Sequence, residues 1–412
     1  MSDSPPYARH RTTGHASSPI ILDLSRLLSR VRHHTPSGVD RVEMAYARGL
    51  LQRYGDRLQF AAVHPLGRYG RLPRNNALRF LDTMERRWTS EDGTIERRPV
   101  LDVVPTLLGL LPRQPPHSEG GVYVQASPHH LTNATLVRRI LARENARFLC
   151  LVHDLIPIEY PEYARINGAA LHQRRIETIV ATADGVIANS AATERSLRPW
   201  LARSGRHIDV RVALLGTQDI PIPKIADRPP SAPYFVCIGT IEPRKNHLLL
   251  LNLWRHMAET EPAHRIPRLI VIGRRGWENE QVVDMLERCY ALQGHVEELN
   301  GCSDQRMYEL LHGARALLLP SFAEGYGMPV AEALSVGTPV LCSNLPALRE
   351  AGGMVPDFLD PLDGPSWKAH ILDYFDCGPR HTAQMQRLAQ WFRPGWLDHI
   401  DIVCAAIEDL RD

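Results

Sequence analysis

The chain has 412 residues, of which 44% are hydrophobic and 23% charged, with a formal net charge of +2. This length suits two domains, and the composition is that of an ordinary globular protein. No run of 18 or more apolar residues occurs, so no membrane-spanning helix is expected. The seven cysteines form no C-x-x-C pair, which argues against a disulfide framework or zinc site and favours a reducing cytosol.

The small net charge hides an asymmetry between the two halves of the chain. Residues 1–230 carry 32 Arg or Lys and 22 Asp or Glu, a net +10, whereas residues 231–412 carry 16 and 24, a net −8. This pattern predicts an anionic partner for the first half. Peripheral contact with an anionic membrane is one such partner, for which we expect a surface formed by Arg26, Arg30, Arg32 and Arg41.

In chain order, the polar residues 1–18 have no apolar signal-peptide core and are typical of a disordered tail. A strand is expected at Pro19–Leu24, followed by a Ser37-Gly38 turn that opens a helix over Val39–Leu51. Further apolar runs alternate with helical spacing, which indicates a parallel sheet covered by helices. These strand-like runs are Gly121–Ser127, Arg147–Asp154, Asp184–Ser190 and Val210–Gly216.

A proline-rich segment divides the chain. Residues 219–233 contain five prolines in fifteen positions, which indicates a linker. The strand and helix alternation then restarts with strands over Tyr234–Thr240, Arg268–Arg274 and Arg315–Ser321. The sequence therefore predicts two doubly wound α/β domains at 19–218 and 234–394, and a last helix at 395–412.

Ligands of doubly wound sheets bind outside the carboxyl ends of the strands, so the loops there are the candidate site. The run after Ser321 has two glycines that allow close backbone approach, followed by a proline suited to the first turn of a helix. Glu324 and Glu332 flank this anion-binding turn, where they suit sugar and ribose hydroxyls better than phosphate. The alternative is a plain strand-to-helix turn in which Glu332 complements the helix dipole.

Three other strand ends carry candidate residues. Arg244 and Lys245 precede a helix, where two cations would neutralise a diphosphate, although a solvated pair is the alternative. His153 ends a buried strand and either contacts a ligand or packs on the next strand. Gly38 is a weaker signal because no complete G-x-G-x-x-G motif surrounds it.

Together these motifs resemble the retaining GT-B glycosyltransferases of family 4, also called group 1. The similar segments are EGYGMPVAE, IGTIEPRKNH, LVHDLIPIEYPEY, VIANSAATERSL and TPSGVDRV. The resemblance implies the GT-B fold, with two Rossmann-like domains facing a central cleft. It also implies that the final helix at 395–412 crosses back over the first domain. The similarity covers most of residues 19–412 and is strongest at 232–352.

The resemblance implies roles for single residues. Arg244 and Lys245 would hold the diphosphate of a nucleotide sugar, with Gly38 and Gly239 beside it. Glu324 and His153 would contact the donor sugar, and Glu332 the ribose. The backbone from Gly325 through Tyr326, Gly327 and Met328 to Pro329 would face the sugar and phosphates. Many relatives have Gly-Arg where this chain has Gly239-Thr240, so we expect Arg244 to replace the missing charge.

The implied function is a hexosyltransferase of surface polysaccharide synthesis, cytoplasmic or peripheral at the inner face of the membrane. Neither metal nor cofactor is expected, because side-chain cations serve the diphosphate, and nothing indicates a nucleic-acid partner. GDP-mannose is favoured as donor, with a glycan or polyprenyl-diphosphate-linked acceptor. The alternatives are a GT-B sugar-nucleotide epimerase or hydrolase that needs no acceptor, and a catalytically silent binding subunit.

Overall fold

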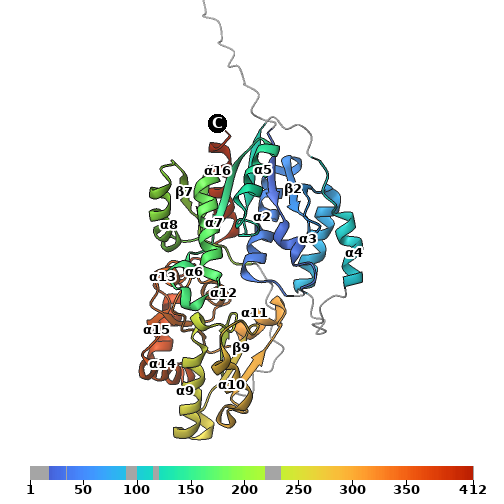
Figure 1. The fold of residues 1–412 in the computed structure, drawn as a ribbon. Coiled ribbons are helices and arrows are strands. Elements are labelled where there is room, and N and C mark those ends of the chain that lie inside the picture. The colour runs from blue at the N-terminus through green and yellow to red at the C-terminus, as the bar shows by residue number, and fades with distance from the viewer. Residues whose placement is uncertain (1–17, 34, 90–99, 115–119, 219–232, 412) are drawn as a thin grey trace, which may run out of the picture.

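In the computed structural model, the described residues are 18–33, 35–89, 100–114, 120–218 and 233–411. They form two α/β domains, one above the other in Figure 1. Most of the expected N-terminal tail and nearly all of the proline-rich linker at 219–233 lie outside these residues. Among the described helices, none is both long and apolar enough to cross a membrane.

The first domain is built on a seven-stranded sheet of order β3-β2-β1-β4-β5-β6-β7. Its strands are β1 (Ile20–Asp23), β2 (Leu58–Val63), β3 (Tyr69–Arg71), β4 (Gly121–Gln125), β5 (Ala146–Val152), β6 (Gly185–Ala188) and β7 (Asp209–Val212). All neighbours are parallel except β3, which pairs antiparallel with β2 at the edge. Every residue of β1 is buried, as expected for a strand covered on both faces.

Helices cover both faces of this sheet. The helices formed by the first part of the chain are α1 (Ser25–Ser29), α2 (Gly38–Tyr54), α3 (Arg74–Thr89), α4 (Val100–Gly109), α5 (Ala134–Glu144), α6 (Ile156–Glu159), α7 (Gly168–Thr182) and α8 (Ala191–Ser204). Helix α2 starts with a capping box in which Ser37 and Asp40 satisfy each other's backbone N–H groups. This cap fixes the turn that the sequence analysis associated with Gly38.

The second domain has a six-stranded, wholly parallel sheet of order β10-β9-β8-β11-β12-β13. Its strands are β8 (Tyr234–Ile238), β9 (Arg268–Ile272), β10 (Val296–Leu299), β11 (Leu317–Leu319), β12 (Val340–Ser343) and β13 (Asp357–Leu359). Its helices are α9 (His247–Thr260), α10 (Glu280–Arg288), α11 (Asp304–His312), α12 (Met328–Ser335), α13 (Pro346–Gly352), α14 (Gly364–Phe375) and α15 (Pro379–Leu388).

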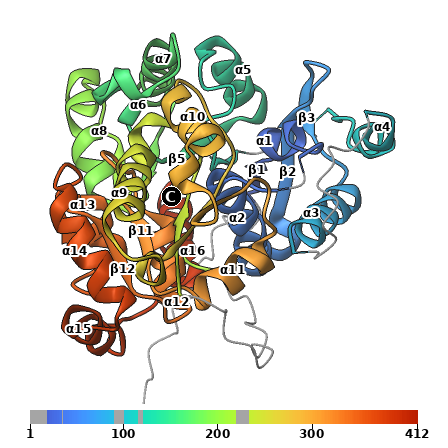
Figure 2. The ribbon, with the colours of Figure 1, turned by 90° about the horizontal axis from the view of Figure 1, so that it is seen from below.

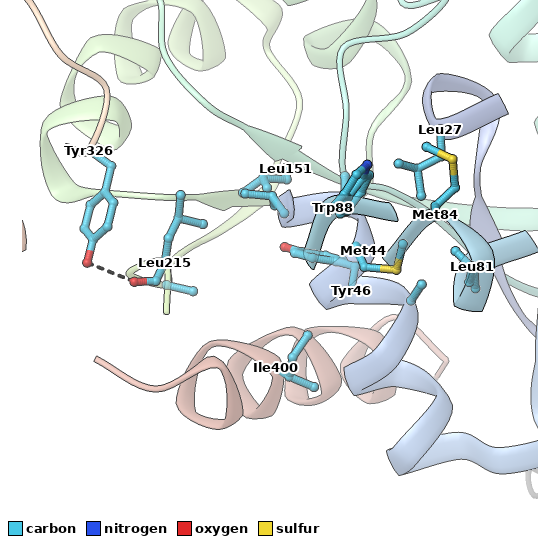
Figure 3. Close-up of a cluster of buried hydrophobic side chains, with 14 of the residues drawn as sticks. Leu27, Met44, Tyr46, Leu81, Met84, Trp88, Leu151, Leu215, Tyr326 and Ile400 are labelled. Carbon is cyan, nitrogen blue, oxygen red and sulfur yellow. Dashed lines mark hydrogen bonds between the residues drawn. The ribbon is translucent and has the colours of Figure 1, made fainter. Parts of the chain in front are cut away.

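The last helix, α16 (Trp396–Asp409), returns to the first domain and lies beside α2 (Figure 1). A Cβ atom at Gly49 would lie 2.5 Å from Ile400, so this close approach of the two helices requires a glycine. Figure 3 shows Ile400 in the same buried cluster as Tyr46 and Leu81 of the first domain. Helix α16 therefore ties the end of the second domain to the core of the first.

The two sheets point their ligand-binding edges toward each other. Figure 2 shows α11 of the second domain beside α2 and α3 of the first. Ser190 at the start of α8 donates a 2.7 Å hydrogen bond to the carbonyl of Gly325, across the same boundary. The loops that follow the strands of both domains consequently meet in one place.

Candidate active site between the two domains

The loops after β8 and β11 bring three of the expected residues together. Lys245 Nζ lies 2.5 Å from one carboxylate oxygen of Glu324, and Arg244 donates to the other at 2.9 Å. Ser321 donates a third hydrogen bond to Glu324, at 2.7 Å. Burial acts to raise the pKa of Glu324, but Lys245 and Arg244 outweigh it and hold that pKa at about 2. We call Glu324, Arg244 and Lys245 the second-domain cluster.

Arg244 makes more ion pairs and hydrogen bonds within the protein than the sequence suggested. Its guanidinium also pairs with Glu242 at 2.6 Å and donates to the carbonyl of Ala323 at 2.8 Å. Burial raises the pKa of Glu242 despite that pairing. Arg244 thus divides its charge between two carboxylates, whereas Lys245 has only Glu324 among its carboxylate partners in the described residues.

The glycines of the loop after β11 are required by close contacts. A Cβ atom at Gly325 would lie 2.3 Å from the carbonyl oxygen of His153 in the first domain. Gly327 has φ +101° and immediately precedes α12, in whose first turn Pro329 lies. Met328 begins that helix, and its sulfur lies 3.4 Å from the Cβ position of Gly38. The start of α12 therefore faces the Gly38 turn.

Tyr326 lies in the same loop, but its side chain is not at the site. The ring is buried in the core, and the hydroxyl donates a 2.9 Å hydrogen bond to the carbonyl of Leu215 (Figure 3). The side chain of Tyr326 is therefore directed away from the proposed ligand, and the expected role of its backbone stays a prediction. Its side chain instead anchors the loop to the first domain.

His153 directly follows β5 and has a fixed orientation. Its Nε2 lies 2.8 Å from the carbonyl of Ala126, which can only accept, so this nitrogen carries the proton. Burial lowers the pKa of the ring and keeps it neutral. Asp154 caps the following turn by accepting from the N–H of Ile156 at 3.1 Å.

Glu332 lies in a second cluster that the sequence analysis did not anticipate. Arg41 reaches from α2 to within 3.6 Å of Glu332 and donates to Asp304 of α11 at 3.2 Å. The three side chains, here called the bridging cluster, have exposed fractions of 13%, 4% and 1% for Arg41, Glu332 and Asp304. Burial raises the pKa of Glu332, although Arg41 acts to lower it.

The bridging cluster corrects one prediction. Arg41 was expected on a surface facing anionic membrane, but its side chain is only 13% exposed and pairs with acids of the second domain. Its partners are far away in sequence, so no local pattern could identify them. The usable signal was position, because Arg41 lies in the first turn of α2, at the ligand-binding edge of β1.

Gly239 brings the ends of two strands together. Its φ is +146°, and a Cβ atom there would lie 3.1 Å from Cε of Lys245. On the other side, a Cβ at Gly273, just after β9, would lie 1.8 Å from the carbonyl oxygen of Gly239. Thr240, which follows, is exposed. The loops after β8 and β9 are thus in direct backbone contact next to Lys245.

A cavity of about 220 Å³ opens beside the second-domain cluster. It lies between the domains and is lined by residues of the β5–α6 loop, the first turns of α8 and α13, and the loop before α12. The lining includes Asp154, Glu159, Tyr160, Phe322 and Glu324. The site therefore has room next to Glu324 for a group that approaches from the first domain.

This arrangement is the GT-B fold, as predicted. The chain superposes on Anabaena Alr3699/HepE in complex with UDP-glucose with a TM-score of 0.60 and 15% identity, covering 95% of this chain and 99% of that one. At this identity the likeness concerns the fold. Residues 220–353 match the family model of the glycosyl transferases group 1.

Curated relatives give a finer resemblance. The O-antigen chain mannosyltransferase B of Escherichia coli is 38% identical over 164 residues, which are 40% of this chain and 42% of that protein. The serotype-specific mannosyltransferase WbdA of Escherichia coli is 28% identical over 234 residues, 50% of this chain and 27% of that protein. The chain thus spans less than half the length of these relatives. With the fold, these matches support a group 1 glycosyltransferase that resembles mannosyltransferases.

Proposed function

We propose that the protein is a retaining hexosyltransferase that moves a sugar, with mannose favoured, from a nucleotide diphosphate to a glycan or lipid-linked glycan in surface polysaccharide synthesis. The observation that carries this proposal is the second-domain cluster, which lies beside the glycine loop at the edge facing the first domain. The names of the O-antigen mannosyltransferases support the reaction class and the kind of acceptor.

The diphosphate would bind between Lys245, the Gly38 turn and the first turn of α12. The Gly38 turn faces Met328 at the start of α12, and the N–H groups of that helix start, which has no side-chain cap, favour an anion. When the sugar binds, Glu324 accepts from its hydroxyl groups, which leaves Lys245 and part of the charge of Arg244 for the diphosphate. The ion pairs of the second-domain cluster therefore hold the cations in place before the donor arrives.

In the proposed reaction, the bond between the anomeric carbon and the β-phosphate oxygen breaks. The acceptor hydroxyl oxygen bonds to the same carbon from the same face, and its proton passes to the departing phosphate oxygen. Lys245 and Arg244 stabilise the charge that develops on that phosphate. His153, which is neutral and fixed by Ala126, contacts the sugar near the reacting carbon.

At the other end of the donor, Glu332 would accept from the ribose hydroxyls. In the structure Arg41 lies 3.6 Å from that carboxylate and is held by Asp304. The nucleotide would bind against this bridging cluster, so that ribose recognition requires both domains. Closure of the cleft then excludes water from the reacting carbon.

The acceptor would enter through the cavity beside Glu324, which is smaller than the roughly 300–1,000 Å³ typical of drug-sized ligands and suits a single sugar ring. The excess of basic residues in the first half of the chain supports a lipid diphosphate carrier and peripheral contact with the inner face of the membrane. We propose that the reaction requires neither a metal nor a cofactor, since Lys245 and Arg244 supply the positive charge that a metal would bring.

The proposal is tested by the thermal stability of the purified protein with GDP, UDP, dTDP and their sugars, in the presence of a chelator. Stabilisation by one nucleotide family identifies the donor base, because a ligand that binds only the folded state raises the unfolding temperature. Sugar-nucleotide turnover without acceptor would favour an epimerase or hydrolase. The absence of any shift across the panel would support a silent binding subunit instead.

A further inference from the structure

The loops after β8 and β9 form one continuous surface at the proposed diphosphate site. The carbonyl of Gly239 contacts Gly273, and the N–H of Ile241 donates to the carbonyl of Arg274 at 2.8 Å. A residue that follows β9 is thus held directly beside Thr240, the position where the chain has no arginine. The end of β9 therefore carries an arginine next to the end of β8, where position 240 is a threonine.

Arg274 is that neighbouring charge, and it points across the cleft. Its guanidinium donates to both the carbonyl and the hydroxyl oxygen of Thr35, in the first-domain loop between β1 and α2. Gly38 lies three residues further along that loop, facing Met328 at the start of α12. Arg274 therefore lies on the same rim as Gly38 and Gly239, the two glycines expected beside the diphosphate.

Arg244, the residue first expected to replace the missing charge, is less well suited. It pairs with both Glu242 and Glu324. The partners that Arg274 meets across the cleft are the two oxygens of Thr35. A phosphate adds charge attraction and a bidentate geometry to its hydrogen bonds with a guanidinium, so it would compete well with the Thr35 oxygens for Arg274.

We propose that Arg274 is a further cation of the donor diphosphate site, in place of an arginine at position 240. In the free protein it fixes the Gly38 loop through Thr35, and in the complex it binds the diphosphate. This assignment rests on the proposed function and adds to it a residue from β9. It assigns to Arg274, rather than to Arg244, the charge that position 240 lacks.

The test is calorimetric binding of GDP and UDP, and of guanosine and uridine, to the wild type and to Arg274→Ala. We expect the variant to bind whichever diphosphate the wild type prefers on the order of 10- to 100-fold more weakly. Binding of the matching nucleoside should not change. The matched control is Arg275→Ala, since Arg275 is the exposed neighbour that pairs with Glu298 and Glu287; it should bind like the wild type.

A rescue separates a charge role from a structural one. Adding Thr240→Arg to the Arg274→Ala variant should restore much of the diphosphate affinity, because it returns the cation to the neighbouring strand end. Equal loss of nucleoside and diphosphate binding, unchanged diphosphate binding, or failure of the rescue in a protein with wild-type unfolding temperature would overturn the assignment. Wild-type protein that binds no nucleoside diphosphate would refute the proposed function itself.

Discussion

The two buried clusters of the site differ in which domains supply their members. Glu324, Arg244 and Lys245 all belong to the second domain, so the second-domain cluster is complete without the first. The bridging cluster requires Arg41 from the first domain to meet Asp304 and Glu332 from the second. The first is therefore organised whether the cleft is open or closed, and the second forms only when the domains approach.

This difference separates two tasks. The second-domain cluster is built for charge stabilisation, because its cations are held in place with little reorganisation. The bridging cluster is suited to domain closure, because Arg41 must lose its hydration to pair with the two buried acids of the second domain. Variants in the two clusters should consequently fail in different ways.

The largest effect is expected within the second-domain cluster. Lys245→Ala or Glu324→Ala should lower kcat for sugar transfer on the order of 100- to 1,000-fold, because a preorganised charge at the leaving group is lost. Steady-state kinetics with saturating donor measure this. Lys368→Ala is the control, since Lys368 pairs with Glu261 and donates to Thr260, neither of which belongs to the site. Near wild-type rates in either site variant would remove the cluster from the mechanism.

A glycine contact tests closure without changing charge. Gly325→Ala would place a Cβ atom 2.3 Å from the carbonyl of His153 and hold the domains apart. Transfer should fall on the order of 100-fold, as for other displacements of about 1 Å at a reacting centre. Gly364→Ala is the control, because its Cβ meets only ordinary contacts at 3.7 Å or more. Small-angle scattering should show a more open molecule for Gly325→Ala alone.

A smaller effect is expected in the bridging cluster. Arg41→Ala leaves Asp304 buried without its main cation, which should cost about 3 kcal/mol of unfolding free energy, the lower end for breaking a buried pair. The donor KM should rise while kcat changes less. Arg48→Ala on the same helix, which breaks surface pairs with Asp82 and Glu85, should cost under about 1 kcal/mol. Equal effects of the two variants would contradict a bridging role.

The smallest effect concerns the helix that joins the domains. His399 of α16 donates through Nδ1 to the carbonyls of Ala213 and Leu214 and accepts from Tyr46, and burial lowers its pKa to about 4. A depressed histidine pKa stabilises the protein above about pH 6.5, and this stability is lost as the pH falls toward 4. The slope should be at most about 1.4 kcal/mol per pH unit, and His399→Gln should reduce it in denaturant titrations.

The second domain could be read from the sequence because its signals are local. Glycines, cations and acids follow short apolar strands within a few residues, and the strand-end rule places them at one edge. Between residues 52 and 120 no such local signal occurs, although β2, β3, α3 and α4 form there. Strand β3 has three residues and pairs antiparallel, and α4 contains Pro105, so neither follows the usual pattern.

Contacts between the two domains could not be predicted from the sequence, for a different reason. Arg41 and Asp304 are 263 residues apart, and Arg274 and Thr35 are 239 apart. Periodicity describes which face of an element is buried, but it does not say which distant element covers that face. The position of Arg41 near a strand end was a usable signal for a site residue. The excess of basic residues in the first half of the chain instead led to the prediction that Arg41 faces a membrane.

The most direct test of the central claim is sugar transfer itself. Purified protein would be incubated with GDP-mannose and a mannose-terminated oligosaccharide in the presence of a chelator, and the product examined by NMR at the anomeric carbon. We predict a new mannosidic linkage with the same anomeric configuration as the donor, abolished by Lys245→Ala. Tight GDP binding with no transfer to any glycan acceptor, or release of free mannose alone, would contradict it.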